Sequence, residues 1–210
     1  MTIPETIDAL RARFGESVGA SVEFRAQTGV AIAREKIVEV CRYLKIEAGF
    51  DVLVDLCGVD YYGEEPRFSV DYLLYSMRDG RYLRLKVRVP EDDAVVDTVS
   101  TVWKAANWQE REAYDMYGIK FRGHPNMKRI LMWEGYPHFP QRKDFPLAGL
   151  PADLPEYGKD VGQTATANML GGPFVAATGT QRTIDREPRQ YDTNAERTDK
   201  LSVTDKQESV

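Results

Sequence analysis

The sequence predicts an α+β fold, in which a small mixed sheet with about three to four helices is followed by a long irregular C-terminal extension. Residues 82–89 alternate apolar and basic side chains, the period-two pattern of a strand with one buried face. Residues 34–48 repeat apolar side chains at helical spacing. Beyond Leu154 apolar residues thin out, so that segment buries too little apolar surface to fold alone. The predicted division is an α+β domain over 1–132 and a Pro-rich, aromatic loop with an extended tail over 133–210.

The first predicted element is an amphipathic helix over Ile3–Phe14. Thr2 stands where an N-cap is expected, and Pro4 falls in the first turn, where its missing N–H costs nothing. Two short apolar-alternating runs follow, at Val18–Arg25 and Val30–Ala33, and they predict a hairpin or paired strands, divided at Thr28-Gly29.

A helix and three strands are predicted next. The helix spans Arg34–Ala48 and stops at Gly49, and Phe50–Val59 is an apolar run expected to form a strand. Arg67–Tyr75 and Tyr82–Val89 then predict a hairpin with Asp79-Gly80 in its connection. The basic row of Arg84, Lys86 and Arg88 is either a ligand surface or, as the pattern favours, a solvated or partner-covered face of the sheet.

Two further helical segments are predicted after Pro90. Acidic residues 91–93 open the first, and apolar residues at 95, 99, 102 or 103, and 106 form its stripe. Asn107 continues or restarts the helix, and Glu110 stands at capping-box spacing from it. Gly118 is expected to end it, and the remainder as far as Pro155 is predicted as loop.

Bulk properties exclude several classes of protein. The 210 residues carry a net charge of −5, and no Lys/Arg block with interleaved aromatics predicts a nucleic-acid surface. The N-terminal residues contain early acids and no apolar run, unlike a secretory signal. The longest uncharged stretch, 161–181, contains many Gly and polar residues, so we interpret it as loop rather than a membrane span.

Metal-binding residue types are scarce. The cysteines are Cys41 and Cys57, neither in a C-x-x-C pair, and both lie in apolar patterns typical of buried thiols in a reducing compartment. The histidines, His124 and His138, lie in turn-like, Pro-rich surroundings. We therefore expect no Fe–S cluster, zinc site or other metal on this chain.

The predicted helix 107–117 has two faces. One collects Trp108, Arg111, Glu112 and Asp115, and the other, with Ala113 and two tyrosines, belongs to the core. An exposed Arg111–Asp115 pair would contribute only about 0.3–0.5 kcal/mol. A buried or interfacial cluster is the alternative, in which loss of one member costs roughly 3–5 kcal/mol. The spacing leaves both open.

An acid–base enzyme using Glu110, Glu112 and His124 is the main catalytic alternative. Carboxylates two residues apart on a helix cannot face one substrate. The sequence also has no Gly-rich phosphate loop, G-x-S-x-G or nucleophile beside a base. No catalytic, cofactor-binding or metal-binding residue is therefore predicted.

Residues 50–150 resemble one known family. Glu110-Arg111-Glu112 is followed at the family's spacing by Asp115, His124, Lys128, Ile130 and Leu131. RKDFPL at 142–147, VDLCGVD at 54–60 and LKVRVPEDD at 85–93 are also similar to family stretches, although the loop at 134–141 is longer than the family's common form. Together these motifs resemble the C-type subunit, or 30 kDa subunit, of respiratory complex I (NADH:quinone oxidoreductase).

The resemblance implies a peripheral-arm subunit that braces the subunits passing electrons from Fe–S clusters to quinone. It implies no cofactor on this chain, with FMN and Fe–S clusters on partner subunits. The closest partner would be the D-type subunit, which is related to the large subunit of [NiFe] hydrogenases, with the B-type and other hydrophilic-arm subunits nearby. NADH and quinone would act only via the complex, held on the cytoplasmic side of the membrane, or the matrix side if mitochondrial. The equivalent subunit of a related plastoquinone reductase or membrane-bound hydrogenase is the alternative.

The candidate site is accordingly an interface with partner chains, to which the extension after Pro151 would also contribute. The partner-interface candidates are Trp108, Glu110, Arg111, Glu112, Asp115, His124, Arg142, Lys143 and Asp144. They lie in a charge-dense, aromatic-rich region, and Arg and Trp are enriched at interface hot spots.

Overall fold

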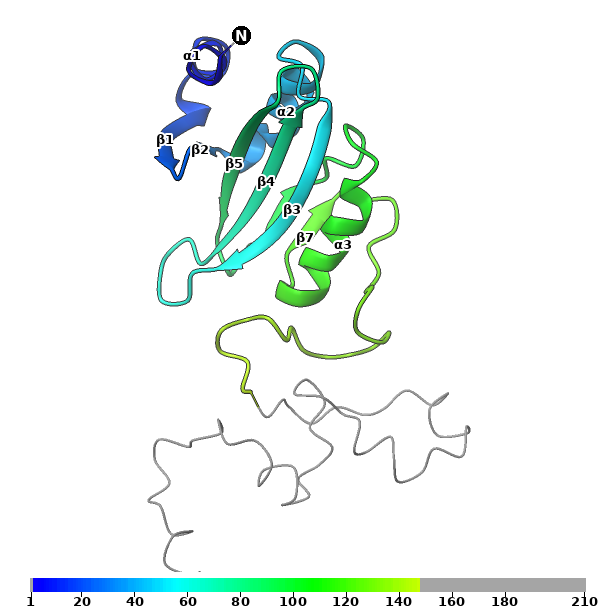
Figure 1. The fold of residues 1–210 in the computed structure, drawn as a ribbon. Helices are drawn as coiled ribbons and strands as arrows, with labels where there is room; N and C mark the ends of the chain where they lie inside the picture. Colours follow the sequence, from blue (N-terminus) through cyan, green and yellow to red (C-terminus); the bar gives the residue numbers. More distant parts are fainter. Residues whose placement is uncertain (1, 148–210) are drawn as a thin grey trace, which may run out of the picture. The chain divides into compact units, whose positions relative to one another are not determined.

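The computed structural model describes residues 2–147, and these confirm the predicted α+β class (Figure 1). In chain order the elements are α1 (Ile3–Phe14), η1 (Gly15–Ser17), β1 (Val18–Phe24), β2 (Gln27–Ile32), η2 (Arg34–Lys36), α2 (Ile37–Ile46), β3 (Val52–Asp60), β4 (Phe68–Ser76), β5 (Arg81–Val89), β6 (Val95–Asp97), α3 (Ala106–Tyr117) and β7 (Lys120–Arg122). One compact unit covers Met1–Phe145. The predicted boundary at 132/133 stays a prediction, and the extension after Pro151 lies outside the described residues.

The main sheet is mixed, with strand order β1-β2-β5-β4-β3. The β2–β5 pair is parallel, whereas β1–β2, β5–β4 and β4–β3 are antiparallel. Figure 1 shows β3, β4 and β5 side by side, with α2 behind them and α3 beside β3. This order places β1 and β3 at the two edges of the sheet.

One face of the sheet forms the core. Leu83, Leu85, Val87 and Val89 are each 0% exposed, which confirms the predicted alternation in β5. The apolar stripe of α2, including Cys41 and Leu44, belongs to the same buried cluster. Gly58 pairs with Val70, which pairs with Val87, so Gly58 lies on this inner face.

Helix α3 packs on the same inner face, at Gly58. A Cβ built on Gly58 would stand 2.5 Å from Cδ2 of Tyr117, so only a glycine lets the helix approach the strand this closely. The position of α3 on β3 therefore depends on a missing side chain.

The start of the chain follows its predicted capping. The Thr2 side chain accepts a hydrogen bond from the Glu5 N–H, and Glu5 accepts one from the Thr2 N–H, forming a capping box. The first hairpin forms as predicted, but the predicted position of its turn was wrong. The chain reverses at Arg25 and Ala26, both at positive φ, and Thr28 and Gly29 lie inside β2.

The helix predicted over 91–106 was wrong. Val95–Asp97 forms β6, which pairs in parallel with β7 at Lys120–Arg122, a segment predicted as loop. The valines of this stretch suit either periodicity, and β-branched residues favour the strand once a partner strand is available. Of the predicted apolar stripe, Val99, Val102, Trp103 and Ala106 reach the core. Val95 is only partly buried, and its neighbour Val96 lies in the core instead, so burial was predicted correctly at four of these positions.

Candidate functional site

Helix α3 carries most of the predicted interface residues and begins without a side-chain cap. Ala105 is its N-cap residue, so the predicted capping box from Asn107 to Glu110 does not form. The helix ends at Gly118, as predicted, in a left-handed conformation with φ of 82°. A Cβ on Gly118 would lie 2.8 Å from both Phe139 and Arg142, so later residues of the chain pack directly on the helix end.

Glu110 turns into the protein instead of capping the helix. Its side chain is 0% exposed, and its two oxygens accept hydrogen bonds from the Val99 N–H at 2.7 Å and the Thr98 hydroxyl at 2.5 Å. Burial raises the pKa of Glu110 to about 7, although both of these hydrogen bonds favour the ionised form. The carboxyl group ties the end of β6 to α3.

His124 lies beside Glu110 in the same buried cluster. Its Nε2 atom is 3.9 Å from Glu110 Oε2 and 3.0 Å from the Asn107 carbonyl oxygen. Nδ1 accepts a hydrogen bond from the Asn126 N–H, which assigns the ring proton to Nε2 and makes the Asn107 carbonyl its acceptor. Both side chains are fully buried, so a substrate in solvent cannot reach the pair.

Asp115 is also fully buried and holds a loop that follows the helix. One carboxylate oxygen, Oδ2, accepts hydrogen bonds from three consecutive backbone N–H groups, those of Ile130, Leu131 and Met132. The other oxygen lies 2.5 Å from the Arg129 guanidinium. A single carboxylate therefore fixes the path of 129–132 while the Leu131 side chain stays 61% exposed.

Arg129 was not among the predicted site residues, yet it joins three parts of the chain. Its guanidinium donates to the Asp115 backbone oxygen at 3.0 Å and to the His138 carbonyl at 3.1 Å. It also lies 5.1 Å from the Phe139 ring centroid and 5.6 Å from that of Tyr136. The loop 133–139 is thereby attached to α3.

Arg111 does not pair with Asp115. Its guanidinium donates to the carbonyls of Lys128 and Arg129, at 3.0 and 3.1 Å, and lies 5.1 Å from the Trp108 ring centroid. The buried-cluster alternative thus holds for Asp115, with Arg129 as its partner. Trp108 itself is 60% exposed.

A second ionic cluster, centred on Arg67, attaches 142–145 to the sheet. Arg67 is 5% exposed and binds both carboxylate oxygens of Asp60, at 2.9 and 3.0 Å. It also binds Glu91 at 2.7 Å and Asp144 at 2.8 Å. The Lys143 N–H donates to Asp60 at 2.8 Å. The hydrogen bond from Arg67 holds the pKa of Asp144 below its usual value.

Arg142 completes this attachment. Its Nε donates to the Tyr117 carbonyl at 2.7 Å, and its guanidinium lies 5.0 Å from the Phe68 ring centroid and 4.7 Å from that of Phe139. Burial lowers the pKa of Arg142. The aromatic and basic residues of the loop therefore pack on this chain's own body.

The nine predicted residues fall into two groups. Glu110, Asp115 and His124 have fully buried side chains that contact described parts of this chain, and Arg142 is mostly buried. The remaining members are exposed to differing degrees: Trp108, Arg111, Glu112, Lys143 and Asp144. Contact with a partner chain stays a prediction for all nine.

The described residues show neither a metal-ion cluster nor a membrane-spanning helix. Within residues 2–147, no group of three or more His, Cys, Asp or Glu side chains is arranged to hold a metal ion. In that same range, no helix is long and apolar enough to cross a bilayer.

Comparisons with known proteins point to one family. A model described as "Respiratory-chain NADH dehydrogenase, 30 Kd subunit" matches residues 30–151. An NADH-quinone oxidoreductase C-type subunit of Rhizobium meliloti (strain 1021) is 49% identical over 156 residues, covering 72% of this chain and 85% of the relative. The C-type subunit of the Geobacter sulfurreducens NADH-quinone oxidoreductase is 47% identical over 141 residues, covering 67% and 87%.

Solved structures share the fold. The trypsin-resistant fragment (1-134) of Nqo5 superposes with a TM-score of 0.54 at 32% identity, covering 60% of this chain and 99% of the fragment. A chain of an archaeal membrane-bound sulfane sulfur reductase gives a TM-score of 0.58 at 24% identity, covering 75% and 90%. The second likeness shows the fold alone.

Proposed function

This chain belongs to the family of the 30 kDa subunit of respiratory-chain NADH dehydrogenases, and we propose that it is a non-catalytic hydrophilic-arm subunit of an NADH:quinone oxidoreductase. It braces the subunits that carry electrons from Fe–S clusters to quinone, with the D-type, hydrogenase-related subunit as its closest partner and the B-type subunit nearby. The FMN and the clusters reside on those and other partner subunits. The complex keeps the chain on the cytoplasmic side of the membrane, or on the matrix side in a mitochondrion.

The observation that supports this role most strongly is the double attachment of the loop after α3. Asp115 with Arg129 fixes 129–132, and Arg67 with Asp60 and Asp144 fixes 142–145. The Arg129–Asp115 and Arg67–Asp60 pairs are buried. Buried ion pairs contribute little net stability compared with apolar packing, but they determine one geometry. A loop fixed in this way binds a partner without losing much conformational entropy.

The same geometry argues against acid–base chemistry on this chain. Glu110 and Asp115 are the carboxylates that could serve as an acid or base, but both are 0% exposed. Each also accepts hydrogen bonds from backbone N–H groups. The exposed groups next to them include Trp108 and Leu131, which are residue types that bury apolar surface in an interface. We therefore assign the exposed side of α3 and the loop 128–131 to partner contact.

We favour an NADH:quinone oxidoreductase over a plastoquinone reductase or a hydrogenase as the complex that contains this chain. The reason is that relatives at 47–49% identity are named as subunits of NADH-quinone oxidoreductases. Mass spectrometry of the complex purified through this chain distinguishes the alternatives. An NADH-binding flavin subunit in stoichiometric amount is expected, whereas a hydrogenase or plastoquinone module would reject the assignment.

Co-purification with the hydrogenase-related D-type subunit tests the interface. Glu112→Lys and Trp108→Ala change exposed side chains of α3, and each is expected to reduce recovery of that partner at least ten-fold, as is Arg111→Glu. Arg78→Glu is the matched control, because Arg78 is 85% exposed in the β4–β5 turn and its ion pair is with its neighbour Asp79. Unchanged recovery from all three variants, with unchanged thermal unfolding, would reject this surface.

A further inference from the structure

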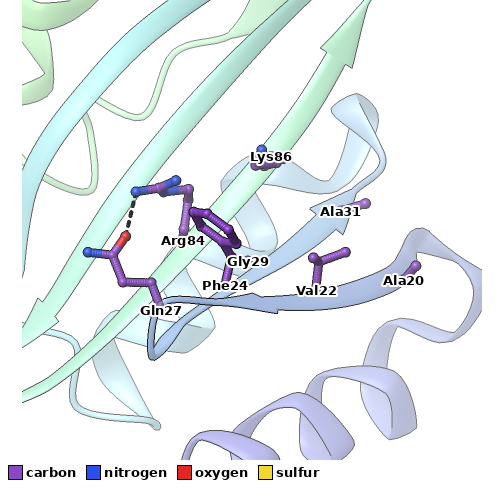
Figure 2. A pocket seen from close by; sticks show the side chains of 8 residues that line it. All are labelled: Ala20, Val22, Phe24, Gln27, Gly29, Ala31, Arg84 and Lys86. Carbon is purple, nitrogen blue, oxygen red and sulfur yellow. Dashed lines mark hydrogen bonds between the residues drawn. The ribbon is translucent and has the colours of Figure 1, made fainter.

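The first hairpin and β5 form an open trough on the outer face of the sheet, opposite α2 and α3. Figure 2 shows the side chains that line it, all of them from β1, β2 and β5. The lining residues are Ala20, Val22, Phe24, Gln27, Gly29, Ala31, Arg84 and Lys86. The hollow has a volume of about 370 Å³. Its floor is made of small residues, and its two sides differ in chemistry.

One side of the trough is apolar and exposed. Val22 is 65% exposed and Phe24 is 68% exposed, both on strand β1. Because β1 is an edge strand, its outer backbone groups have no strand partner among residues 2–147. An edge strand with exposed large apolar side chains promotes aggregation unless another chain covers it. The exposed apolar side chains and free edge of this hairpin therefore favour its being covered by another chain.

The other side is basic and incompletely neutralised. Arg84 makes its hydrogen bond to the neutral side chain of Gln27, at 2.8 Å, and forms no ion pair within the described part of the chain (Figure 2). Lys86 stands 3.6 Å from Asp71, a weak pairing for an exposed ammonium group. A further cation, Arg25 in the β1–β2 turn, is not one of the lining residues and lies 5.2 Å from the Phe24 ring centroid on the apolar side.

We propose that this trough receives a segment of a partner subunit that places apolar side chains against Val22 and Phe24 and a carboxylate against Arg84. Charge complementarity selects the acid, since an uncompensated cation beside an apolar wall gains most from an anionic partner. The exposed edge of β1 offers backbone hydrogen bonds to an extended segment as well. The surface lies on the face opposite α3, so it is a second contact, distinct from the one around Trp108.

Because the occupant comes from a neighbouring subunit, this assignment rests on the proposed function. The experiment places a photo-crosslinking benzoylphenylalanine at position 24 in the assembled oxidoreductase. We expect a crosslink to one partner segment that contains apolar residues and an Asp or Glu. Arg84→Glu should lower the crosslink yield at least ten-fold, whereas Arg84→Lys should retain it. The same probe at Ile46, 73% exposed in α2, is the matched control.

Several outcomes would overturn the trough assignment. These are no crosslink from position 24, a crosslink to a second copy of this chain, to residues 148–210 of this chain or to lipid, and a yield that is insensitive to Arg84→Glu. For every variant, the complex is purified before crosslinking, so that its assembly is established independently of the crosslink. An assembled complex without a crosslink therefore rejects the trough alone, whereas failure of any partner to co-purify rejects the proposed function.

Discussion

The Asp115 carboxylate and the Arg129 guanidinium lie 2.5 Å apart beneath the loop that follows α3. The two residues are 14 positions apart, and their side chains are 0% and 11% exposed. Asp115 also accepts hydrogen bonds from three consecutive backbone N–H groups of the loop, so the pair fixes the path of the main chain as well as the two side chains. The shape of the exposed loop is thus set by a charge that is itself buried.

Removing that carboxylate should destabilise the whole unit. Asp115→Ala removes the negative partner of the Arg129 charge and the acceptor of three N–H groups, and we expect the free energy of unfolding to fall by about 3–5 kcal/mol. Asp115→Asn should cost less, because the amide oxygen still accepts. Urea denaturation of the full chain measures both. Glu112→Ala, one turn away and exposed, is the control and should change stability by at most about 0.5 kcal/mol. Equal effects of Asp115→Ala and Glu112→Ala would contradict this role.

Glu110 should make stability depend on pH. Its pKa is about 7 in the folded chain against 4.5 as the reference, so the folded state holds this proton more tightly than the unfolded state. The contribution of Glu110 to the free energy of unfolding is complete below about pH 4.5. It is lost as the pH rises through 7, so the free energy of unfolding decreases by about 3 kcal/mol. Glu110→Gln keeps the hydrogen-bond acceptor and cannot titrate. The difference in unfolding free energy between wild type and this variant should therefore fall between pH 4.5 and 8. A constant difference would show that Glu110 does not titrate in this range.

Arg67 should protect the peptide bonds after Arg142 and Lys143 from trypsin. Arg67→Gln removes the bonds to Asp60 and Asp144 and leaves buried carboxylate charge uncompensated, which favours local opening. Cleavage at these two sites should become at least ten-fold faster, as timed by mass spectrometry. Arg78→Gln, at an exposed arginine, should leave the rate unchanged. Equal rates in both variants would mean that Arg67 does not attach this segment.

The close approach of α3 to β3 should not tolerate a methyl group. In Gly58→Ala the new Cβ meets the Tyr117 ring at 2.5 Å, so helix or ring must shift, and we expect a loss of about 1–3 kcal/mol. Gly29→Ala is a matched control, since its Cβ would meet Lys86 at an ordinary 3.8 Å. Calorimetry of the two variants compares them. A Gly58→Ala protein as stable as Gly29→Ala would place α3 further from the strand.

Local patterns predicted much of the fold. The alternation in β5, the capping residues around Thr2 and the stop at Gly118 are properties of neighbouring residues, and each formed as expected. The helix prediction for 91–106 failed because the conformation of this segment depends on residues far away in the sequence. Its valines suit a helix stripe or a strand equally, and pairing of β6 with β7, 25 residues further on, decides between them.

The charge pairs within the candidate site could not be predicted, because they too depend on residues far apart in the sequence. Helical spacing singled out Asp115, and the resemblance of residues 142–147 to a family motif singled out Asp144. Their cationic partners, Arg129 and Arg67, stand 14 and 77 residues away. No helical or strand period relates positions at such separations. The burial of Glu110 was also hidden, because its spacing from Asn107 suited a capping box and its acceptor role depends on a turn at Thr98 and Val99.

Hydroxyl-radical footprinting of the isolated chain and of the assembled oxidoreductase tests whether this chain works through surfaces buried against its neighbours. Trp108 and Leu131 are 60% and 61% exposed in the free chain, so both should be oxidised readily there. In the complex, oxidation of both side chains should fall at least ten-fold. Equal oxidation of Trp108 and Leu131 in the two samples would leave α3 and its loop in solvent and contradict the bracing role.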